Sequence, residues 1–466
     1  MSEGVAAFFE PKSVAVVGAS RNPEKLGHVV LRQLLENFEG RVYPVNPKAD
    51  EILGLKCYPS VTSLPEAVDL AVVAVPAPIT PQVVRECGER GVKAAIVISG
   101  GFSEVGNVEL EEELKETAKK YGVRIIGPNC MGIYRPSSGL DTLFTPSDRL
   151  PRPPRGDVAI LTQSGSFGGA ILTWLAMEGK GISVFVSYGN RADVDEADLI
   201  EYLSEDPETR VIAIYIEGLS NGRRFMEAAR RVSPRKPIVV FKAGRSQKGA
   251  RAVQSHTGSL AGSDSAYEAA FKQSGVVRAY STEEFLDVSR ALARLPLPRG
   301  PGVGIITNGG GYGVIAVDAL EEQGLEVPDL DEDTRKRLRE QLPPYYPVGN
   351  PLDLTGSSTP EQYLIGMREM AKSESIDALM VMALYSVPLM EPKRTTDYIL
   401  QVVEQYGKPV VVVSLDVTPD VAEQNSRLES LGIPVYPAPE RAAKALAALW
   451  RYARAKARLA TASATQ

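Results

Sequence analysis

The sequence predicts an α/β protein of three domains, each a Rossmann-like or flavodoxin-like fold built on a mainly parallel sheet. Short runs of Val, Ile, Leu and Ala alternate with longer polar stretches of helix length along all 466 residues, which is typical of a sheet covered by helices. The short runs are apolar throughout, as expected for strands buried on both faces. At roughly 150 residues per domain, the length indicates about three domains.

The expected strands fall into three groups. They are 13–19, 42–46, 70–76, 94–99 and 124–129 in the first group, 158–163, 183–188, 211–217 and 237–243 in the second, and 303–308, 378–384, 409–415 and 434–436 in the third. Proline-rich segments at 146–156 and 296–301 separate the groups. We therefore expect domains at 1–150, 151–297 and 298–460, with ligands at the carboxyl ends of the strands.

Composition excludes several classes of protein. Hydrophobic residues make up 44% and charged residues 24% of the chain, which is the globular average, and no apolar run approaches the ~20 residues that span a membrane. The net charge of −6 argues against a nucleic-acid-binding protein, because no basic field is available to neutralise phosphates. The first residues lack the regions of a signal peptide, so we expect a cytoplasmic location. Three scattered cysteines predict neither a disulfide framework nor a metal site.

The first strand ends in a glycine turn that favours a phosphorylated nucleotide. It leads into Gly18 and Ser20, where backbone N–H groups at a helix N-terminus can approach an anion. The G-x-G-x-x-G spacing of a dinucleotide site is missing, because the next glycine is Gly27. The second strand is followed by Lys48, a cation, where NAD-binding domains have a carboxylate. A nucleotide with a ribose phosphate therefore fits better than NAD.

Three further strand ends carry unusual loops that should meet on the same rim: 75–78 (Val-Pro-Ala-Pro), 99–102 (Ser-Gly-Gly-Phe) and 127–132 (Gly-Pro-Asn-Cys-Met-Gly). With the first turn, they resemble the CoA-binding domain of the succinyl-CoA synthetase superfamily. The resemblance implies CoA-binding roles for Gly18, Ser20, Arg21, Asn22, Lys25 and Lys48 at the phosphates and sugar, Ser99, Gly100 and Gly101 along the pantetheine, and Asn129 near the thiol. Cys130 is interpreted as a buried small residue and not as a nucleophile.

The segment 254–264 (QSHTGSLAGSD) is the most unusual in the chain. It contains His256, one of two histidines in the sequence, among small and hydroxyl residues that let the backbone approach an anion. An imidazole with a pKa of about 6.5 is available as a nucleophile at neutral pH. No other histidine or cysteine stands at metal-ligand spacing, so a metal site is not indicated. The small-residue setting, the scarcity of histidine and the two anion-binding turns described next favour a catalytic His256 over the alternative, a structural histidine.

Two strand–turn–helix segments could hold a phosphoryl group on either side of this histidine. They are 162–169 (TQSGSFGG) and 307–313 (TNGGGYG), and each offers unpaired N–H groups and the positive end of a helix dipole. The expected phosphate-binding residues are Ser164, Gly165, Ser166, Asn308, Gly309 and Gly310. Glu217, at the end of an apolar strand, is predicted to accept the imidazole Nδ1–H and leave Nε2 free to attack. The alternative for Glu217 is a cap or surface carboxylate.

In this order, and with 350–354 (NPLDL), the motifs resemble the α subunit of ADP-forming (NDP-forming) acetyl-CoA or acyl-CoA synthetases. Met131 stands where succinyl-CoA synthetases have Pro, which favours the acyl-CoA branch. The resemblance implies that phosphate displaces CoA from acyl-CoA, and that the phosphoryl group of the acyl phosphate passes to His256 and then to ADP, reversibly.

Motifs of an ATP-grasp domain are not found in the sequence. The resemblance therefore implies an ATP-grasp β subunit, in an α2β2 heterotetramer, that supplies ADP or ATP and Mg²⁺ while the chain itself binds CoA, phosphate and a small carboxylic acid. Other hypotheses stay open: a succinyl-CoA synthetase-like ligase, an NAD-dependent dehydrogenase, a CoA-dependent acyltransferase, and a non-catalytic CoA-sensing protein. A separate ATP-grasp chain in the source genome would argue against the sensor. The acyl group and the choice of ADP or GDP stay open.

Overall fold

The computed structural model describes residues 3–257, 263–415 and 418–464, and for residues 3, 254–257 and 462–464 it describes the backbone alone. The chain forms two compact units, 1–278 and 279–466. Both are α/β structures with mainly parallel sheets, which confirms the predicted fold class. Within the described ranges, no helix has both the length and the apolar character to cross a membrane.

The first sheet of the unit 1–278 has five parallel strands in the order β2-β1-β5-β6-β7. Its strands are β1 (Ser13–Val17), β2 (Arg41–Val45), β5 (Leu70–Val73), β6 (Ala94–Val97) and β7 (Arg124–Ile126). The other elements of this region are α1 (Glu3–Ala6), α2 (Leu26–Asn37), β3 (Glu51–Ile52), β4 (Leu55–Lys56), α3 (Thr80–Arg90) and α4 (Val108–Tyr121), with 3₁₀ turns at Val61–Ser63, Ala77–Ile79 and Ser103–Val105. β2 lies on one side of β1 and β5 on the other, so the strand order reverses at β1. Open α/β sheets bind ligands at such a reversal, at the carboxyl ends of the strands.

The second sheet has seven strands in the order β14-β13-β12-β10-β11-β8-β9. They are β8 (Gly132–Arg135), β9 (Leu140–Asp141), β10 (Arg155–Thr162), β11 (Ile182–Ser187), β12 (Val211–Ile216), β13 (Ile238–Lys242) and β14 (Val277–Ala279). The helices are α5 (Gly165–Met177), α6 (Glu196–Glu205), α7 (Gly222–Val232), α8 (Gln247–Thr257) and α9 (Asp264–Ser274), and a 3₁₀ turn covers Pro136–Ser138. The strands β10 to β13 are parallel, whereas β8 and β9 add an antiparallel edge that the sequence analysis did not predict.

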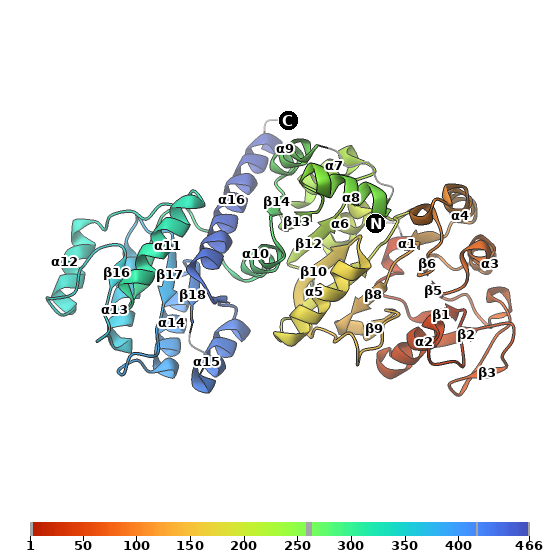
Figure 1. Ribbon diagram of the computed structural model, residues 1–466, viewed down its shortest axis with the longest axis horizontal. Helices are drawn as coiled ribbons and strands as arrows, with labels where there is room; N and C mark the ends of the chain where they lie inside the picture. The colour runs from red at the N-terminus through yellow and green to blue at the C-terminus, as the bar shows by residue number, and fades with distance from the viewer. Residues whose placement is uncertain (1–2, 258–262, 416–417, 465–466) are drawn as a thin grey trace. The chain divides into compact units, whose positions relative to one another are not determined.

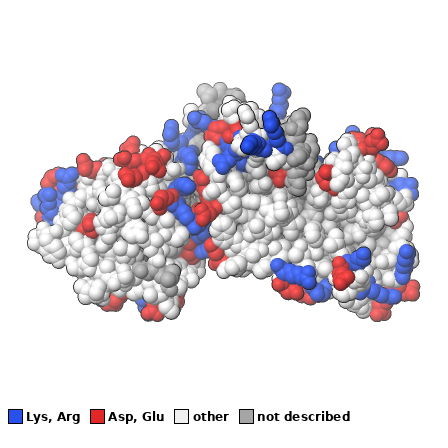
Figure 2. All heavy atoms as spheres, in the orientation of Figure 1, with Lys and Arg blue, Asp and Glu red and all other residues white. Residues whose placement is uncertain are grey.

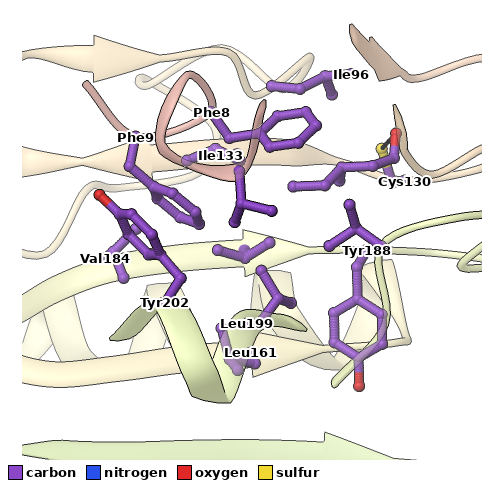
Figure 3. Packing of buried hydrophobic residues seen from close by; sticks show 14 of the residues in the cluster. Phe8, Phe9, Ile96, Cys130, Ile133, Leu161, Val184, Tyr188, Leu199 and Tyr202 are labelled. Atoms are coloured by element: carbon purple, nitrogen blue, oxygen red, sulfur yellow. Dashed lines mark hydrogen bonds between the residues drawn. The ribbon is translucent and has the colours of Figure 1, made fainter. Parts of the chain in front are cut away.

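A shared hydrophobic core joins the two sheets of the unit 1–278. Phe8 and Phe9, just after α1, are fully buried, and Figure 3 shows them among side chains from both sheets and from α6. The ring of Phe9 stacks on that of Tyr202, with centroids 4.4 Å apart. Burying one such side chain contributes roughly 1.5–3 kcal/mol. This core therefore holds the first and second sheets in a defined relation.

The unit 279–466 contains a third sheet of five parallel strands in the order β16-β15-β17-β18-β19. They are β15 (Val303–Thr307), β16 (Leu352–Asp353), β17 (Ala378–Met382), β18 (Val410–Val413) and β19 (Val435–Tyr436). The helices are α10 (Thr282–Arg294), α11 (Gly310–Glu322), α12 (Glu332–Gln341), α13 (Pro360–Lys372), α14 (Pro392–Tyr406), α15 (Pro419–Ser430) and α16 (Pro439–Ala464). Within this unit, Arg441 Nε lies 2.7 Å from the carboxylate of buried Asp287, which ties α16 to α10.

Figure 1 traces both units along the chain, with helices lying against the strands of each sheet. On the face drawn in Figure 2, Lys and Arg side chains are interspersed with Asp and Glu side chains. Such mixing is typical of an ordinary protein surface and not of a basic field for nucleic acid.

Candidate functional site

A cavity of about 660 Å³, here called the smaller cavity, opens at the carboxyl ends of β1, β2 and β5. β1 runs into Gly18, whose φ is +91°, and a Cβ at this position would lie 2.4 Å from the carbonyl oxygen of Ala74. Only glycine accepts both the left-handed backbone and this close approach. The chain therefore turns sharply off the strand and leaves open space above it.

Of the six residues predicted to bind the nucleotide end of CoA, four line the smaller cavity: Gly18, Ser20, Lys25 and Lys48. The other two make contacts within their own region of the fold. Arg21 Nε donates to the carbonyl oxygen of Glu51 at 2.9 Å, and Asn22 Oδ1 accepts the backbone N–H of Glu24 at 2.9 Å. Arg21 and Asn22 thus shape the loop that carries Ser20 and Lys25.

The smaller cavity suits an anionic nucleotide. Among the described residues that line it, the charged side chains are Lys25, Lys48 and Glu86, so the wall carries a net positive charge. The proline loop after β5 contributes Val75 and Pro76, as its position at a strand end predicted. Gln82 and Glu86 come from α3 and had no sequence signal, because their side chains reach the cavity only through the packing of that helix.

A larger cavity of about 880 Å³ lies within the same unit and collects residues from both sheets. Five predicted site residues line it: Asn129, Ser164, Gly165, Ser166 and Glu217. Leu26, the first residue of α2, lines both this cavity and the smaller one. The carboxyl-end rims of the first and second sheets, predicted separately, therefore open onto adjoining spaces.

The turn of Ser164, Gly165 and Ser166 has the geometry of an anion site. Ser164 caps α5, and its Oγ accepts the backbone N–H of Phe167 at 3.3 Å. Thr162 Oγ1 accepts the Ser164 N–H at 3.1 Å and donates to the Ser164 carbonyl at 2.8 Å, which fixes the turn. The N-terminus of a long helix carries a partial positive charge, so this end of the larger cavity favours a phosphate.

Gln163 connects this turn to Glu217. Its Oε1 accepts the backbone N–H groups of Glu217 at 2.5 Å and of Gly218 at 3.2 Å. Its Nε2 donates to Glu196 Oε1 at 2.6 Å and to the Gly218 carbonyl at 2.7 Å. Sequence reasoning named Glu217 but missed Gln163, because a glutamine beside a glycine turn carries no sign of which backbone it will reach.

Glu217 is buried at the end of β12 and faces the larger cavity. The hydroxyl of Tyr215 donates to its Oε1 at 3.3 Å. Burial raises the pKa of Tyr215, and the neighbouring Glu217 carboxylate raises it further, so this hydroxyl stays a hydrogen-bond donor at neutral pH. The carboxylate thus has the position of a group that could orient an imidazole at the cavity wall.

Ser99, Gly100 and Gly101, in the loop after β6, line neither cavity, although Ile98 and Glu104 of the same loop line the larger one. Ser99 Oγ donates to the Val75 carbonyl, and the Gly101 N–H donates to Glu104 Oε1. Burial alone would raise the pKa of Glu104, but hydrogen bonds from Gly101 and from the Asn190 amide outweigh it and lower that pKa. Gly100 stands next to the Asn129 side chain, with 3.3 Å between its ideal Cβ position and Asn129 Oδ1.

His256 belongs to the last turn of α8, and its side chain lies outside the described residues. Its predicted relation to Glu217 therefore stays a prediction. The other histidine, His28, is buried in α2, where its Nδ1 lies 2.8 Å from the Ser20 carbonyl and braces the loop above the smaller cavity.

The second predicted phosphate turn lies in the unit 279–466 and repeats the local design of the first. Gly310 begins α11, and Thr307 Oγ1 accepts the Gly309 N–H at 3.0 Å, as Thr162 does for Ser164. The buried amide of Asn308 exchanges two hydrogen bonds with the Leu384 backbone, so its side chain holds the turn in place. The contacts available for an anion at this turn are therefore backbone N–H groups.

Cys130 lines the larger cavity but is almost fully buried. Its Sγ lies 3.3 Å from the Val97 carbonyl, and burial raises the pKa of the thiol to about 12. A thiol that stays protonated is a poor nucleophile, so the interpretation of Cys130 as a buried small residue is confirmed. In the described part of the chain, no group of three or more His, Cys, Asp and Glu side chains could hold a metal ion.

Comparisons with known proteins give the family of the chain. Residues 12–136, 155–292 and 303–460 match the families described as CoA binding domain, succinyl-CoA ligase like flavodoxin domain and Ligase-CoA domain. The alpha subunit of ADP-forming acetate–CoA ligase I of Pyrococcus furiosus is 45% identical to this chain over 461 residues. The match covers 97% of this chain and 98% of that protein.

A longer relative and a solved structure extend the comparison. The ADP-forming acetate–CoA ligase I of Archaeoglobus fulgidus is 42% identical over 97% of this chain, which spans 64% of that protein. The dinucleotide forming acetyl-coenzyme A synthetase 1 of Ca. Korarchaeum cryptofilum, solved in complex with phosphate and ADP, is similar with a TM-score of 0.91 and 42% identity over 99% of both chains.

Proposed function

The chain belongs to the family of ADP-forming acetate–CoA ligases, matching an α subunit of that family over 97% of its length, and we propose that its two adjoining cavities bring CoA and phosphate together for acyl transfer. The smaller cavity would take the nucleotide end of CoA, with Lys25 and Lys48 at its phosphates. The pantetheine would pass Leu26, which borders both cavities, and present the thioester beside Asn129 in the larger one. This adjacency is the observation that carries the proposal.

The first chemical step would take place at the turn of Ser164, Gly165 and Ser166. A phosphate oxygen attacks the carbonyl carbon of the thioester, a C–O bond forms and the C–S bond breaks. The electron pair of that bond passes to the CoA sulfur, which takes up a proton. The helix N-terminus stabilises the phosphate charge throughout, and the products are acyl phosphate and free CoA.

His256 would then receive the phosphoryl group. Its Nε2 attacks the phosphorus, an N–P bond forms, the P–O bond to the acyl group breaks, and the carboxylate leaves. Glu217, on the wall of the same cavity, would accept the Nδ1–H and hold the required tautomer. Phosphohistidine finally transfers the group to ADP, and the whole sequence is reversible.

The delivery to ADP is proposed to need a partner. The relative of matching length is named a subunit alpha, which supports a second subunit for this chain. We propose an ATP-grasp β subunit that binds ADP or ATP with Mg²⁺, assembled as an α2β2 heterotetramer in the cytoplasm. The turn of Asn308, Gly309 and Gly310 would be a second phosphate contact. The acid is proposed to be acetate or another small carboxylic acid.

We also propose that three domains along the chain have different roles. Residues 1–150 would bind CoA, 151–297 would carry the phosphohistidine, and 298–460 would supply the second phosphate turn. The three sheets and the three family matches support this division. The strands β8 and β9 complicate the first boundary, because they precede residue 150 and pair with the second sheet.

Phosphohistidine labelling tests the proposal. The chain, co-expressed with an ATP-grasp subunit and incubated with Mg²⁺ and γ-labelled ATP, should acquire one acid-labile, base-stable phosphate. The label should disappear on adding ADP, or acetate together with CoA. His256→Ala should abolish labelling and acyl-CoA synthesis without changing CoA binding, whereas His28→Ala should leave the labelling intact. An acid-stable label, or undiminished labelling of His256→Ala, would overturn this mechanism and favour a CoA sensor.

A further inference from the structure

Arg191 stands in a loop that is held in an unusual conformation at the wall of the larger cavity. Its φ is +52°, in the left-handed region that residues with a side chain rarely adopt. Backbone hydrogen bonds tie the loop to the Gly-Pro-Asn turn: the Asn190 N–H donates to Pro128 at 2.9 Å and the Ala192 N–H donates to Gly127 at 2.9 Å. Such strain persists where surrounding structure enforces it, and functional sites are where it gathers.

In the described part of the chain, the guanidinium of Arg191 is held by hydrogen bonds from Nη1 alone. Nη1 donates to Glu196 Oε1 at 2.9 Å and to the Gly218 carbonyl. These are the same two acceptors that Gln163 Nε2 uses, so the guanidinium is tied to the residue that precedes the phosphate turn. The Arg191 side chain is only 10% exposed.

The remaining donors of Arg191 face the cavity. Within the described part of the chain, Nε and Nη2 make no hydrogen bond. A fully buried nitrogen without a partner would be an unsatisfied donor, and Nε and Nη2 are not of this kind. They are therefore open to solvent, and the solvent next to Arg191 is that of the larger cavity, which it lines. A guanidinium held in this way presents up to three N–H donors to a ligand.

The charge balance of the larger cavity makes this group important. Its described charged side chains are three carboxylates, Glu104, Glu111 and Glu217, against Lys115 and Arg191. Lys115 lies 3.3 Å from the Glu112 carboxylate and 3.9 Å from that of Glu111, and its side chain is 37% exposed. Arg191 is thus the less exposed of the two described cations that line this cavity. The described charges of the cavity sum to −1 with Arg191 and would sum to −2 without it, so its loss would increase the repulsion of a doubly negative ligand.

We propose that Arg191 binds the phosphate oxygens of inorganic phosphate and of the acyl phosphate in the larger cavity, which the N-terminus of α5 also lines. The inference rests on the proposed function. A planar, always-charged fork of donors is suited to a phosphate group. Arg191 takes no proton and forms no bond in the step: the phosphate oxygen still attacks the thioester carbon, and the electron pair still leaves on sulfur.

The test uses the complete enzyme with its β subunit and compares Arg191→Gln with Arg191→Lys. With ADP, Mg²⁺ and saturating acyl-CoA, the KM for phosphate should rise at least about tenfold in Arg191→Gln, the size expected for one lost charge-assisted hydrogen bond. Arg191→Lys should recover part of this loss. The KM for acyl-CoA should stay within about twofold, because the smaller cavity is untouched.

Arg224→Gln is the matched control for a structural effect. Arg224 pairs with Asp195 at 2.8 Å and with Asp198 at 2.7 Å in the first turn of α6, next to the Glu196 that Arg191 contacts, but it does not line the cavity. This variant should lower the melting temperature and leave the KM for phosphate unchanged. If Arg191→Gln keeps the wild-type KM, or if both variants raise it equally, the inference is wrong.

Equilibrium dialysis of the full chain with ³²P-labelled inorganic phosphate separates this inference from the proposed function. If the wild-type chain binds phosphate and the Arg191→Gln chain binds it at least about tenfold more weakly, the phosphate-binding role of Arg191 is supported, whatever reaction the complex catalyses. Equal binding by the two proteins overturns it. An enzyme complex without acid-labile label contradicts the proposed function alone.

Discussion

Replacing Gln163 by Leu should loosen the connection between the phosphate turn and Glu217. The change removes the acceptor of two backbone donors, the N–H groups of Glu217 and Gly218. Gly218 O and Glu196 keep a donor, because Arg191 bonds to both. A donor left without a partner costs about 1–3 kcal/mol. Two such donors, partly rehydrated from the cavity, give an expected loss of roughly 2–4 kcal/mol in the free energy of unfolding.

Replacing Gln163 by Glu adds a dependence on pH. One carboxylate oxygen would take the place of Nε2, which lies 2.6 Å from Glu196 Oε1. Repulsion between the two carboxylates raises the folded-state pKa of the new group above its unfolded value of about 4.3. A group whose pKa is raised by folding loses its contribution as the pH rises through the folded pKa. The loss of stability relative to wild type should therefore be larger at pH 8 than at pH 5.

Fluorescence during urea unfolding can measure both variants. The chain has two tryptophans, and Trp174 lies in α5, which starts at the phosphate turn. A Trp450→Phe background leaves Trp174 as the reporter of the unit 1–278. Gln401→Leu, at an exposed position of α14 in the other unit, is the matched control and should leave this transition unchanged. A Gln163→Leu protein with the wild-type midpoint and full turnover would refute the reasoning.

Two further predictions concern the smaller cavity and Glu217. Lys48→Glu should weaken CoA binding by about 10- to 150-fold in titration calorimetry, since a charge-assisted hydrogen bond contributes roughly 1.5–3 kcal/mol. The control is Lys93→Glu, which should leave CoA binding unchanged, because Lys93 is exposed at the amino end of β6, away from the carboxyl ends of the strands. Equal binding by the Lys48 and Lys93 variants would remove the phosphate assignment. Glu217→Gln should lower kcat and leave the Kd for CoA unchanged, because the amide keeps the shape of the carboxylate but loses the charge that favours the attacking tautomer. Full turnover in that variant would make Glu217 a structural residue.

Local pattern explains why the strands and turns were predictable. Strands such as β1 and β12 are buried on both faces, so their sequences are apolar throughout, and each predicted strand is found within a few residues of its expected position. Glycine turns such as that at Gly18 are visible because close backbone contacts exclude a side chain. Four of the six predicted nucleotide-binding residues line the smaller cavity for the same reason: the loop after a parallel strand always faces its carboxyl-end rim.

Contacts between distant segments explain what was missed. Phe8 and Phe9 precede the first strand, yet they form the centre of the core that joins two sheets. β8 pairs with β11, more than fifty residues away, and no repeating pattern in so short a strand predicts that partner. Arg21 bonds to the backbone of Glu51, a contact that the sequence analysis did not foresee, because a long flexible side chain on a surface loop can point in several directions. Its role at the phosphates of CoA stays a prediction.

The sequence by itself determined the fold class and the family and singled out candidate residues for the chemistry, because strand burial, glycine turns and the rare histidine are visible in short stretches of sequence. The tertiary structure alone decided that the rims of the first and second sheets open onto adjoining cavities. It also decided that Gln163, Glu196 and Arg191 join Glu217 behind the phosphate turn. The physical reason is that hydrogen bonds and packing between segments far apart in the chain depend on side-chain direction and distance, which the order of residues does not record.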